Sequence, residues 1–215
     1  MYQLVIFDMD GTLADTSPGI LNSHRHANAM MGRSVPDDAA LAGVIGGPLL
    51  QTYIDRFGFS EADARKAVDI YRRYYSEHGI HEACLYPGMA RTLAALKQQG
   101  VAIGLATLKA ERFAKVMLEE MGVLDCFTVV YGMDEQDTRT KSQLIELCMD
   151  SVGVSKEHSL MVGDSIHDLN GAKSAGIDFL GVTYGFGFRP GENRGIPMVD
   201  TTEEILSFAL NAPLG

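Results

Sequence analysis

Five short runs of the chain are apolar at successive positions rather than only on one face. They are residues 4–7 (LVIF), 102–106, 128–132, 160–163 and 179–185. Neighbouring residues of a strand point to opposite faces of the sheet. A run of strand length that is apolar at odd and even positions alike is therefore typical of a strand buried on both faces, as in a parallel sheet. The sequence therefore predicts five buried parallel strands.

Segments with helical spacing lie between the later runs and after the last one. They are residues 109–122, 140–153, 168–176 and 201–210. The first ends at Gly122, a residue type favoured just beyond a helix, and the last opens with Thr201 and Glu204 at capping-box spacing. Because strands alternate with helices, we expect right-handed crossovers and a three-layer α/β core.

The alternation is broken between the first run and a helical segment at residues 86–100 that leads to the second run, an interval of roughly seventy residues. This interval carries three more segments with helical spacing, at residues 18–32, 48–58 and 60–79. An interval of this length with its own helices is more typical of a small domain than of a loop. We expect a core of residues 1–14 and 84–215, with a helical insertion over residues 15–83. The insertion would sit over the carboxyl end of the sheet, where open α/β sheets bind ligands.

Composition and charge narrow the class of protein. A net charge of −10 argues against nucleic acid or an anionic membrane as a partner, and no apolar run approaches the roughly 18–20 residues of a membrane span. Cys84, Cys126 and Cys148 are far apart and odd in number, which fits unpaired thiols in a reducing compartment. We expect a soluble, cytoplasmic protein that acts on a small molecule. Nothing in the pattern indicates an oligomeric state.

Polar residues follow four of the predicted strands at the point where each strand ends. They are Asp8, Asp10, Thr107, Lys109, Lys141, Asp164 and Asp168. The carboxyl ends of parallel strands meet at one edge of a sheet, so these side chains are expected to converge in one active site. An EF-hand beginning at Asp8 does not fit, because Leu13 and Gly19 stand where glycine and glutamate are needed.

The stretch DMDGTLADT (8–16), followed by Thr107, Lys141 and GDSIHD (163–168), resembles the haloacid dehalogenase superfamily of phosphatases. The resemblance covers essentially the whole chain. It implies a Rossmann-like core with a helical cap, as in the phosphoglycolate phosphatase and β-phosphoglucomutase branch. It also implies Mg²⁺ as cofactor and a small phosphorylated metabolite as substrate, with a phosphoglycolate-like ester as the best guess.

The resemblance implies roles for the four aspartates. Asp8 would be the nucleophile that forms an aspartyl-phosphate, and Asp10 would protonate the leaving group and later deprotonate water. Mg²⁺ would be held by the Asp8 side chain, the Asp10 main-chain carbonyl and Asp164. Asp168 would hold the waters of the metal ion, or Lys141.

The resemblance also implies contacts to the phosphoryl group. These would come from the Thr107 hydroxyl, the backbone N–H of Leu108 and the Lys141 ammonium. Leu108 departs from the asparagine that is usual there. We prefer Lys141 to Lys109, because RTKSQLIEL resembles the family's lysine at a helix start, and Lys109 is then expected to be solvated on the following helix. Gly47 is a candidate substrate contact, although a plain helix connection fits its segment equally well.

Two alternatives stay open at this stage. A sugar phosphomutase of the β-phosphoglucomutase kind would retain both Asp8 and Asp10, although its motif usually has a β-branched apolar residue where Thr12 stands. A binding protein without catalytic activity could keep the same fold. The identity of the phosphate ester is not encoded in any pattern that we recognise.

Overall fold

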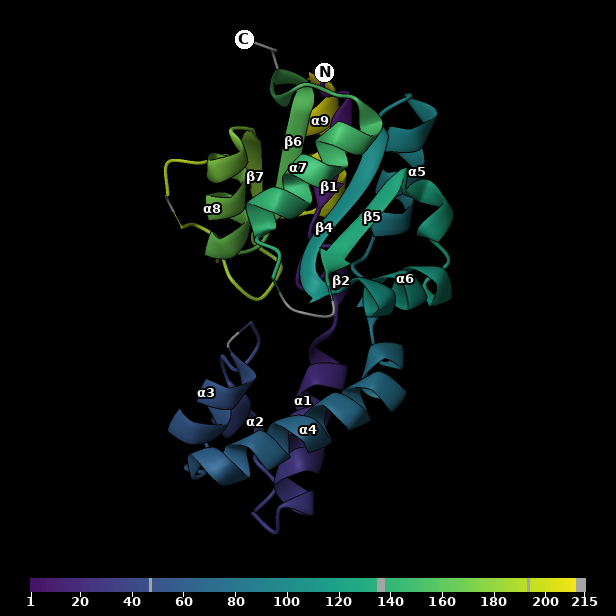
Figure 1. Cartoon of the computed structure of the whole chain (residues 1–215). Coiled ribbons are helices and arrows are strands. Elements are labelled where there is room, and N and C mark those ends of the chain that lie inside the picture. The colour runs from purple at the N-terminus through teal and green to yellow at the C-terminus, as the bar shows by residue number, and fades with distance from the viewer. Residues whose placement is uncertain (47, 135–137, 193, 212–215) are drawn as a thin grey trace. The chain divides into compact units, whose positions relative to one another are not determined.

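The computed structural model describes residues 1–46, 48–134, 138–192 and 194–211, and the chain divides into two compact units (Figure 1). The larger unit comprises Met1–Asp15 and Cys84–Gly215, and the smaller one Thr16–Ala83. The insertion was expected to begin at residue 15, and Asp15 pairs with Cys84 in a short ribbon of the larger unit.

A six-stranded sheet forms the centre of the larger unit. Its strand order is β5-β4-β1-β6-β7-β8, and all of its pairings are parallel. The strands are β1 (Leu4–Phe7), β4 (Ala102–Ala110), β5 (Val129–Met133), β6 (Ser159–Gly163), β7 (Asp178–Val182) and β8 (Met198–Val199). The five predicted strands are confirmed. Strand β8 was not predicted, because two residues are too few to form a pattern.

Helices cover both faces of this sheet. They are α5 (Met89–Gln98), α6 (Glu111–Glu120), α7 (Lys141–Val152), α8 (Ile166–Ala175) and α9 (Thr202–Asn211). The helices α7 and α8 pack together on one face, and α5 and α9 pack together on the other (Figure 1). Ile6 of β1, Met161 of β6 and Leu144 of α7 are fully buried in the core between these layers. The α/β, Rossmann-like class predicted from the sequence is confirmed.

The end of β4 differs from the prediction in a way that matters for the site. The helix predicted over residues 109–122 begins at Glu111, because β4 continues through Ala110. The register between β4 and β5 shifts between Ala106 and Ala110. Irregularities of this kind often lie beside active sites, where they redirect side chains.

The smaller unit is helical, as expected. It contains α1 (Ser17–Met30), α2 (Asp38–Leu41), α3 (Leu49–Asp55), α4 (Glu61–Glu77) and a short 3₁₀ helix, Gly79–His81. The helices α1 and α3 both pack on α4. Ser60, the N-cap of α4, accepts a hydrogen bond from the Asp63 backbone N–H at 3.2 Å.

A two-stranded antiparallel ribbon marks where the chain leaves and rejoins the larger unit. It is formed by β2 (Ala14–Asp15) and β3 (Cys84–Leu85). Within the described residues, no helix has both the length and the apolar character needed to cross a membrane. The three cysteines are free thiols, as the sequence predicted.

Candidate active site

Lys141 connects two of the predicted aspartates at the carboxyl edge of the sheet. As the first residue of α7, it donates from Nζ to Asp8 Oδ1 at 2.7 Å and to the Ala106 carbonyl at 3.0 Å. The same Nζ lies 2.8 Å from Asp168 Oδ1. All three ionic side chains are buried, with exposed fractions of 6% for Lys141, 11% for Asp8 and 1% for Asp168. The structure thus places the preferred lysine beside the expected nucleophile.

Local capping fixes both helices that supply this contact. Thr140 and Gln143 form a capping box at the start of α7, directly before Lys141. Ser165 and Asp168 form another at the start of α8, and Asp168 Oδ2 accepts hydrogen bonds from Ser165 Oγ at 2.6 Å and Ser165 N at 3.1 Å. Both oxygens of Asp168 therefore have a contact, one with Lys141 and one with Ser165. This arrangement suits a residue that holds Lys141 in place.

Asp164 is held by the chain that follows β7. Its Oδ2 accepts hydrogen bonds from the backbone N–H of Phe186 at 2.7 Å and of Gly187 at 3.0 Å. A side chain at Gly185 would overlap the Gly11 carbonyl oxygen and the Asp164 side chain. The glycine therefore allows this segment to wrap closely around the carboxylate. Sequence analysis did not assign the glycines of this segment a role.

The turn after β1 is fixed by its own glycine and by a tyrosine. Gly11 has φ of +79°, and a Cβ there would overlap Asp164 Oδ2, so a larger residue would be strained and crowded. The Tyr184 hydroxyl donates to the Thr12 carbonyl at 3.0 Å, and Thr12 is fully buried. These contacts hold the loop that carries Asp10.

Burial has the largest effect on the pKa values of Asp8 and Asp164. It raises the pKa of Asp8 to about 7, against the opposing charge of Lys141. Burial and the charge of Asp168 raise the pKa of Asp164 to about 6. Burial alone would lower the pKa of Lys141, but the charges of Asp168 and Asp8 outweigh it and raise that pKa. The site is therefore rich in buried negative charge that its own residues only partly compensate.

The donor set fits a hard divalent cation. Among the described residues, Asp8, Asp164 and Asp168 form the group whose ligand atoms all lie within 4.8 Å of one another. These ligands are all oxygens, which Mg²⁺ prefers. Asp8, Asp10 and Asp168 contact the ammonium groups of Lys141 and Lys109, and Asp164 lies beside Asp8 and Asp168 without such a contact being shown by any ion pair of the described residues. A divalent cation would balance the excess charge.

Lys109 does not lie where sequence analysis expected it. It was expected to be solvated on the helix after β4, but it belongs to β4 itself and its side chain is only 7% exposed. Its Nζ lies 3.1 Å from Asp10 Oδ1. The physical reason is that the strand continues past Thr107, which turns the lysine inward.

The predicted phosphate contacts have different environments. Thr107 is buried, and its Oγ1 accepts a hydrogen bond from the Lys109 N–H at 3.2 Å. Leu108 is 41% exposed between these two buried side chains. Gly47 lies outside the described residues, so the structure does not place it.

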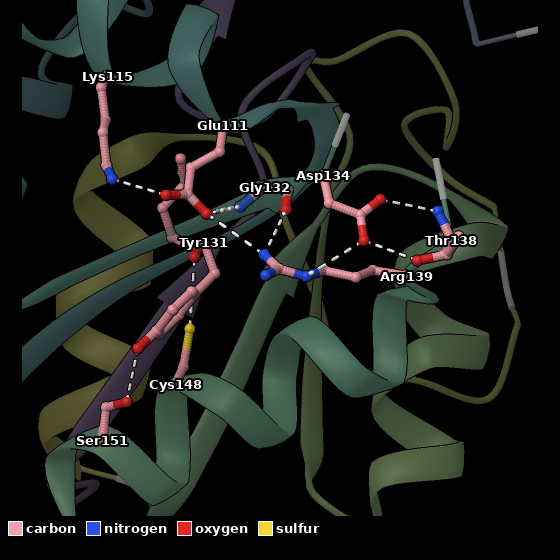
Figure 2. A network of polar contacts seen from close by, with 10 residues as sticks. Glu111, Lys115, Tyr131, Gly132, Asp134, Thr138, Arg139, Cys148 and Ser151 are labelled. Atoms are coloured by element: carbon pink, nitrogen blue, oxygen red, sulfur yellow. Dashed lines mark hydrogen bonds and ion pairs between the residues drawn. The ribbon is translucent and has the colours of Figure 1, made fainter. Parts of the chain in front are cut away.

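A further polar network joins the end of β5 to Thr138 and Arg139, which come shortly before Lys141 (Figure 2). Arg139 donates to the Gly132 carbonyl at 3.1 Å and pairs with Glu111 at 3.4 Å. Asp134 Oδ2 accepts from the Thr138 hydroxyl at 2.6 Å. Sequence analysis missed this network, although an arginine two residues before the key lysine was a possible signal. The network ties the start of α6 to the segment that leads into α7.

The α/β fold thus carries a cluster of buried carboxylates at the carboxyl edge of its sheet. The family model described as haloacid dehalogenase-like hydrolase matches residues 5–182, and the chain belongs to this family. This confirms the resemblance seen in the sequence.

Known relatives and a solved structure agree with this membership. A 5'-nucleotidase of Pseudomonas aeruginosa is 40% identical and is matched over 86% of this chain and 85% of its own. Tyrosine-protein kinase PtkA of Mycobacterium tuberculosis is 36% identical over 86% of this chain, which spans only 63% of that relative. A phosphoglycolate phosphatase of Pseudomonas syringae is 32% identical, with 92% and 73% covered. A haloacid dehalogenase-like hydrolase of Streptococcus pneumoniae superposes with a TM-score of 0.86 at 28% identity, over 96% of this chain and 98% of its own.

Proposed function

We propose that this phosphoric monoester hydrolase is a Mg²⁺-dependent phosphatase that works through an aspartyl-phosphate on Asp8. The observation that carries the proposal is the buried contact between Asp8 and Lys141, within a cluster of oxygen ligands. Family membership supports the same chemistry, as do the names of two relatives, a 5'-nucleotidase and a phosphoglycolate phosphatase.

Charge is the main obstacle to this reaction. At an effective dielectric constant of 20 and 4 Å, a carboxylate and a phosphate dianion repel each other by about 8 kcal/mol. Lys141 already lies 2.7 Å from Asp8 and can contact an incoming phosphoryl oxygen as well. When bound, Mg²⁺ would supply the further positive charge that stabilises the phosphoryl oxygens.

The reaction would proceed in two steps, transfer of the phosphoryl group to Asp8 and hydrolysis of the aspartyl-phosphate. Asp8 forms a bond to phosphorus as the ester bond breaks, and Asp10 gives its proton to the leaving oxygen. Asp10 then takes a proton from water, which attacks phosphorus, releases inorganic phosphate and restores Asp8. The Thr107 hydroxyl and the Leu108 N–H would orient the phosphoryl oxygens during both steps.

The substrate proposed is a small phosphate monoester. A phosphoglycolate-like ester was the expectation from the sequence, and one relative carries that name at 32% identity. The relative at 40% identity is named a 5'-nucleotidase, which favours including nucleoside 5'-monophosphates. Both classes present a terminal phosphate monoester, so the same four aspartates would serve for either.

The test is release of inorganic phosphate from a panel of such esters, with Mg²⁺ and with excess chelator. Wild-type protein should release phosphate only with the metal ion, and Asp8→Asn should abolish release without changing the far-ultraviolet circular dichroism spectrum. Asp150→Asn, an exposed position on α7, is the matched control and should keep full activity. Turnover by Asp8→Asn at a near-normal rate would show that Asp8 is not the nucleophile.

A further inference from the structure

The two aspartates of the Asp-x-Asp pair contact different lysines. Asp8 contacts Lys141, which comes from α7, whereas Asp10 contacts Lys109, which comes from β4. Both lysine side chains are almost fully buried, at 6% and 7% exposure. Burying an ammonium group is costly unless it is paired with an opposite charge. The burial of Lys109 beside Asp10 therefore needs an explanation of its own, separate from that of Lys141 beside Asp8.

The end of β4 explains how Lys109 reaches Asp10. Side chains alternate between the two faces of a strand, and here Thr107 and Lys109 are buried while Leu108 between them is exposed. The register shift between Ala106 and Ala110 covers these three residues. The Lys109 N–H also donates to Thr107 Oγ1, which ties the lysine backbone to the predicted phosphate contact.

Asp10 needs such a contact more than Asp8 does. Its side chain is 27% exposed, against 11% for Asp8, so solvent offers the carboxylate other rotamers. Its Oδ1 is buried and has no hydrogen-bond partner of good geometry among the described residues, and the ammonium group of Lys109 attracts it from 3.1 Å. A general acid must lie within hydrogen-bond reach of the leaving oxygen to act at all.

We propose that Lys109 is a positioning residue that holds the Asp10 carboxylate toward the leaving group. The inference rests on the proposed function, because it assumes that Asp10 transfers the proton. Lys109 forms and breaks no covalent bond, and the proton still passes from Asp10 to the leaving oxygen and returns from water. Its effect is on the fraction of time that Asp10 spends in reach.

The test compares esters that need a general acid to different degrees. An alkyl phosphate leaves as a basic alkoxide and depends strongly on protonation, whereas p-nitrophenyl phosphate leaves as a stabilised phenolate and depends on it little. Lys109→Met should therefore lower kcat/KM for glycerol phosphate by about 10- to 100-fold, and for p-nitrophenyl phosphate much less. Lys109→Arg, which keeps the charge, should recover part of the loss.

Lys115→Met is the matched control. Lys115 lies on α6, is 51% exposed and pairs with Glu111 at 2.6 Å. The substitution therefore removes one positive charge and one ion pair, as Lys109→Met does, but at a position that does not contact the aspartates. It should leave both rates unchanged. Thermal unfolding of each variant shows whether the fold is retained, and Lys109→Arg provides a second variant if Lys109→Met does not fold.

Three outcomes would overturn the inference. An equal loss of kcat/KM for both esters would mean a general structural effect. A rise in KM confined to esters with a second anionic group, such as phosphoglycolate, would make Lys109 a substrate contact. If Lys109→Met kept the wild-type kcat/KM with both esters, Lys109 would have no role in positioning Asp10. Asp10→Asn separates these results from an error in the proposed function: if it spares the alkyl ester, Asp10 is not the general acid, and that step of the proposed function is wrong, whereas Asp8→Asn tests the phosphatase function itself.

Discussion

Acidification should destabilise the helical unit (residues 16–83) through a single buried histidine. His24 of α1 is fully buried, with its ring 5.4 Å from Tyr53, 5.7 Å from Phe57 and 4.7 Å from Tyr71. Neither ring nitrogen has a hydrogen-bond partner among the described residues. Burial lowers the pKa of His24 from 6.5 to about 4. The aromatic surroundings of His24 thus favour the neutral form of the ring over the protonated form.

The sign and size of the effect follow from proton linkage. In the unfolded chain the histidine binds a proton below about pH 6.5, whereas in the folded unit it stays neutral down to about pH 4. The unfolded state therefore binds more protons in this window, and stability falls as the pH falls. From about pH 7 to about pH 4.5 the expected loss is about 2 kcal/mol from this residue alone.

Urea denaturation followed by circular dichroism would measure this loss. His24→Leu removes the titrating group and two unpaired nitrogens, so it should be close to neutral at pH 7 and should lose about 2 kcal/mol less than wild type on acidification. His26→Gln is the control, because its ring stacks on Tyr74 at 4.3 Å and is only half-buried. If wild type and His24→Leu lost equal stability on acidification, the reasoning would be refuted.

Two further predictions concern the site. Lys141→Met leaves Asp8 and Asp168 buried without their cation, so it should abolish phosphate release and lower the free energy of unfolding of the metal-free protein by about 3 kcal/mol, as measured in urea. An unchanged rate would contradict the role given to Lys141. Gly185→Ala places a methyl group against Gly11 and Asp164, so it should weaken cation binding about 10-fold. Titration of Mn²⁺ by electron paramagnetic resonance, with displacement by Mg²⁺, measures this directly, and equal affinity would show that the segment does not hold Asp164.

Much of the core could be predicted because its strands are buried on both faces. A run such as residues 4–7 is apolar throughout for that reason, and the polar residues directly after each strand then mark one edge of the sheet. The order of Asp8, Lys141 and Asp164 along the chain was therefore sufficient to expect them close together. The helices of the insertion were predicted from their helical spacing.

The rest depended on interactions that leave no periodic trace. Lys109 begins a stretch with helical spacing, but the pairing of Ala110 with Met133 extends the strand past the lysine. Lysine is also mostly solvated in proteins, so burial beside Asp10 could not be expected from residue type. The carboxylate of Asp164 accepts hydrogen bonds from the backbone N–H groups of Phe186 and Gly187. Every residue except proline has such a group, so the sequence carries no distinct signal for this contact.

The helical unit interrupts the chain between β1 and its neighbours, and this affects the order of folding. Leu4 of β1 pairs with Ala102 of β4, so closing that contact in a disordered chain means ordering a loop of about 100 residues. The helical unit is a continuous segment whose own contacts are local. If it forms first, with Asp15 brought opposite Cys84, the flexible loop shortens to about 30 residues and the entropic cost of closure falls by about 1 kcal/mol. Early folding of this segment would therefore speed the docking of the strand that leads into Asp8, although the segment contains none of the four aspartates.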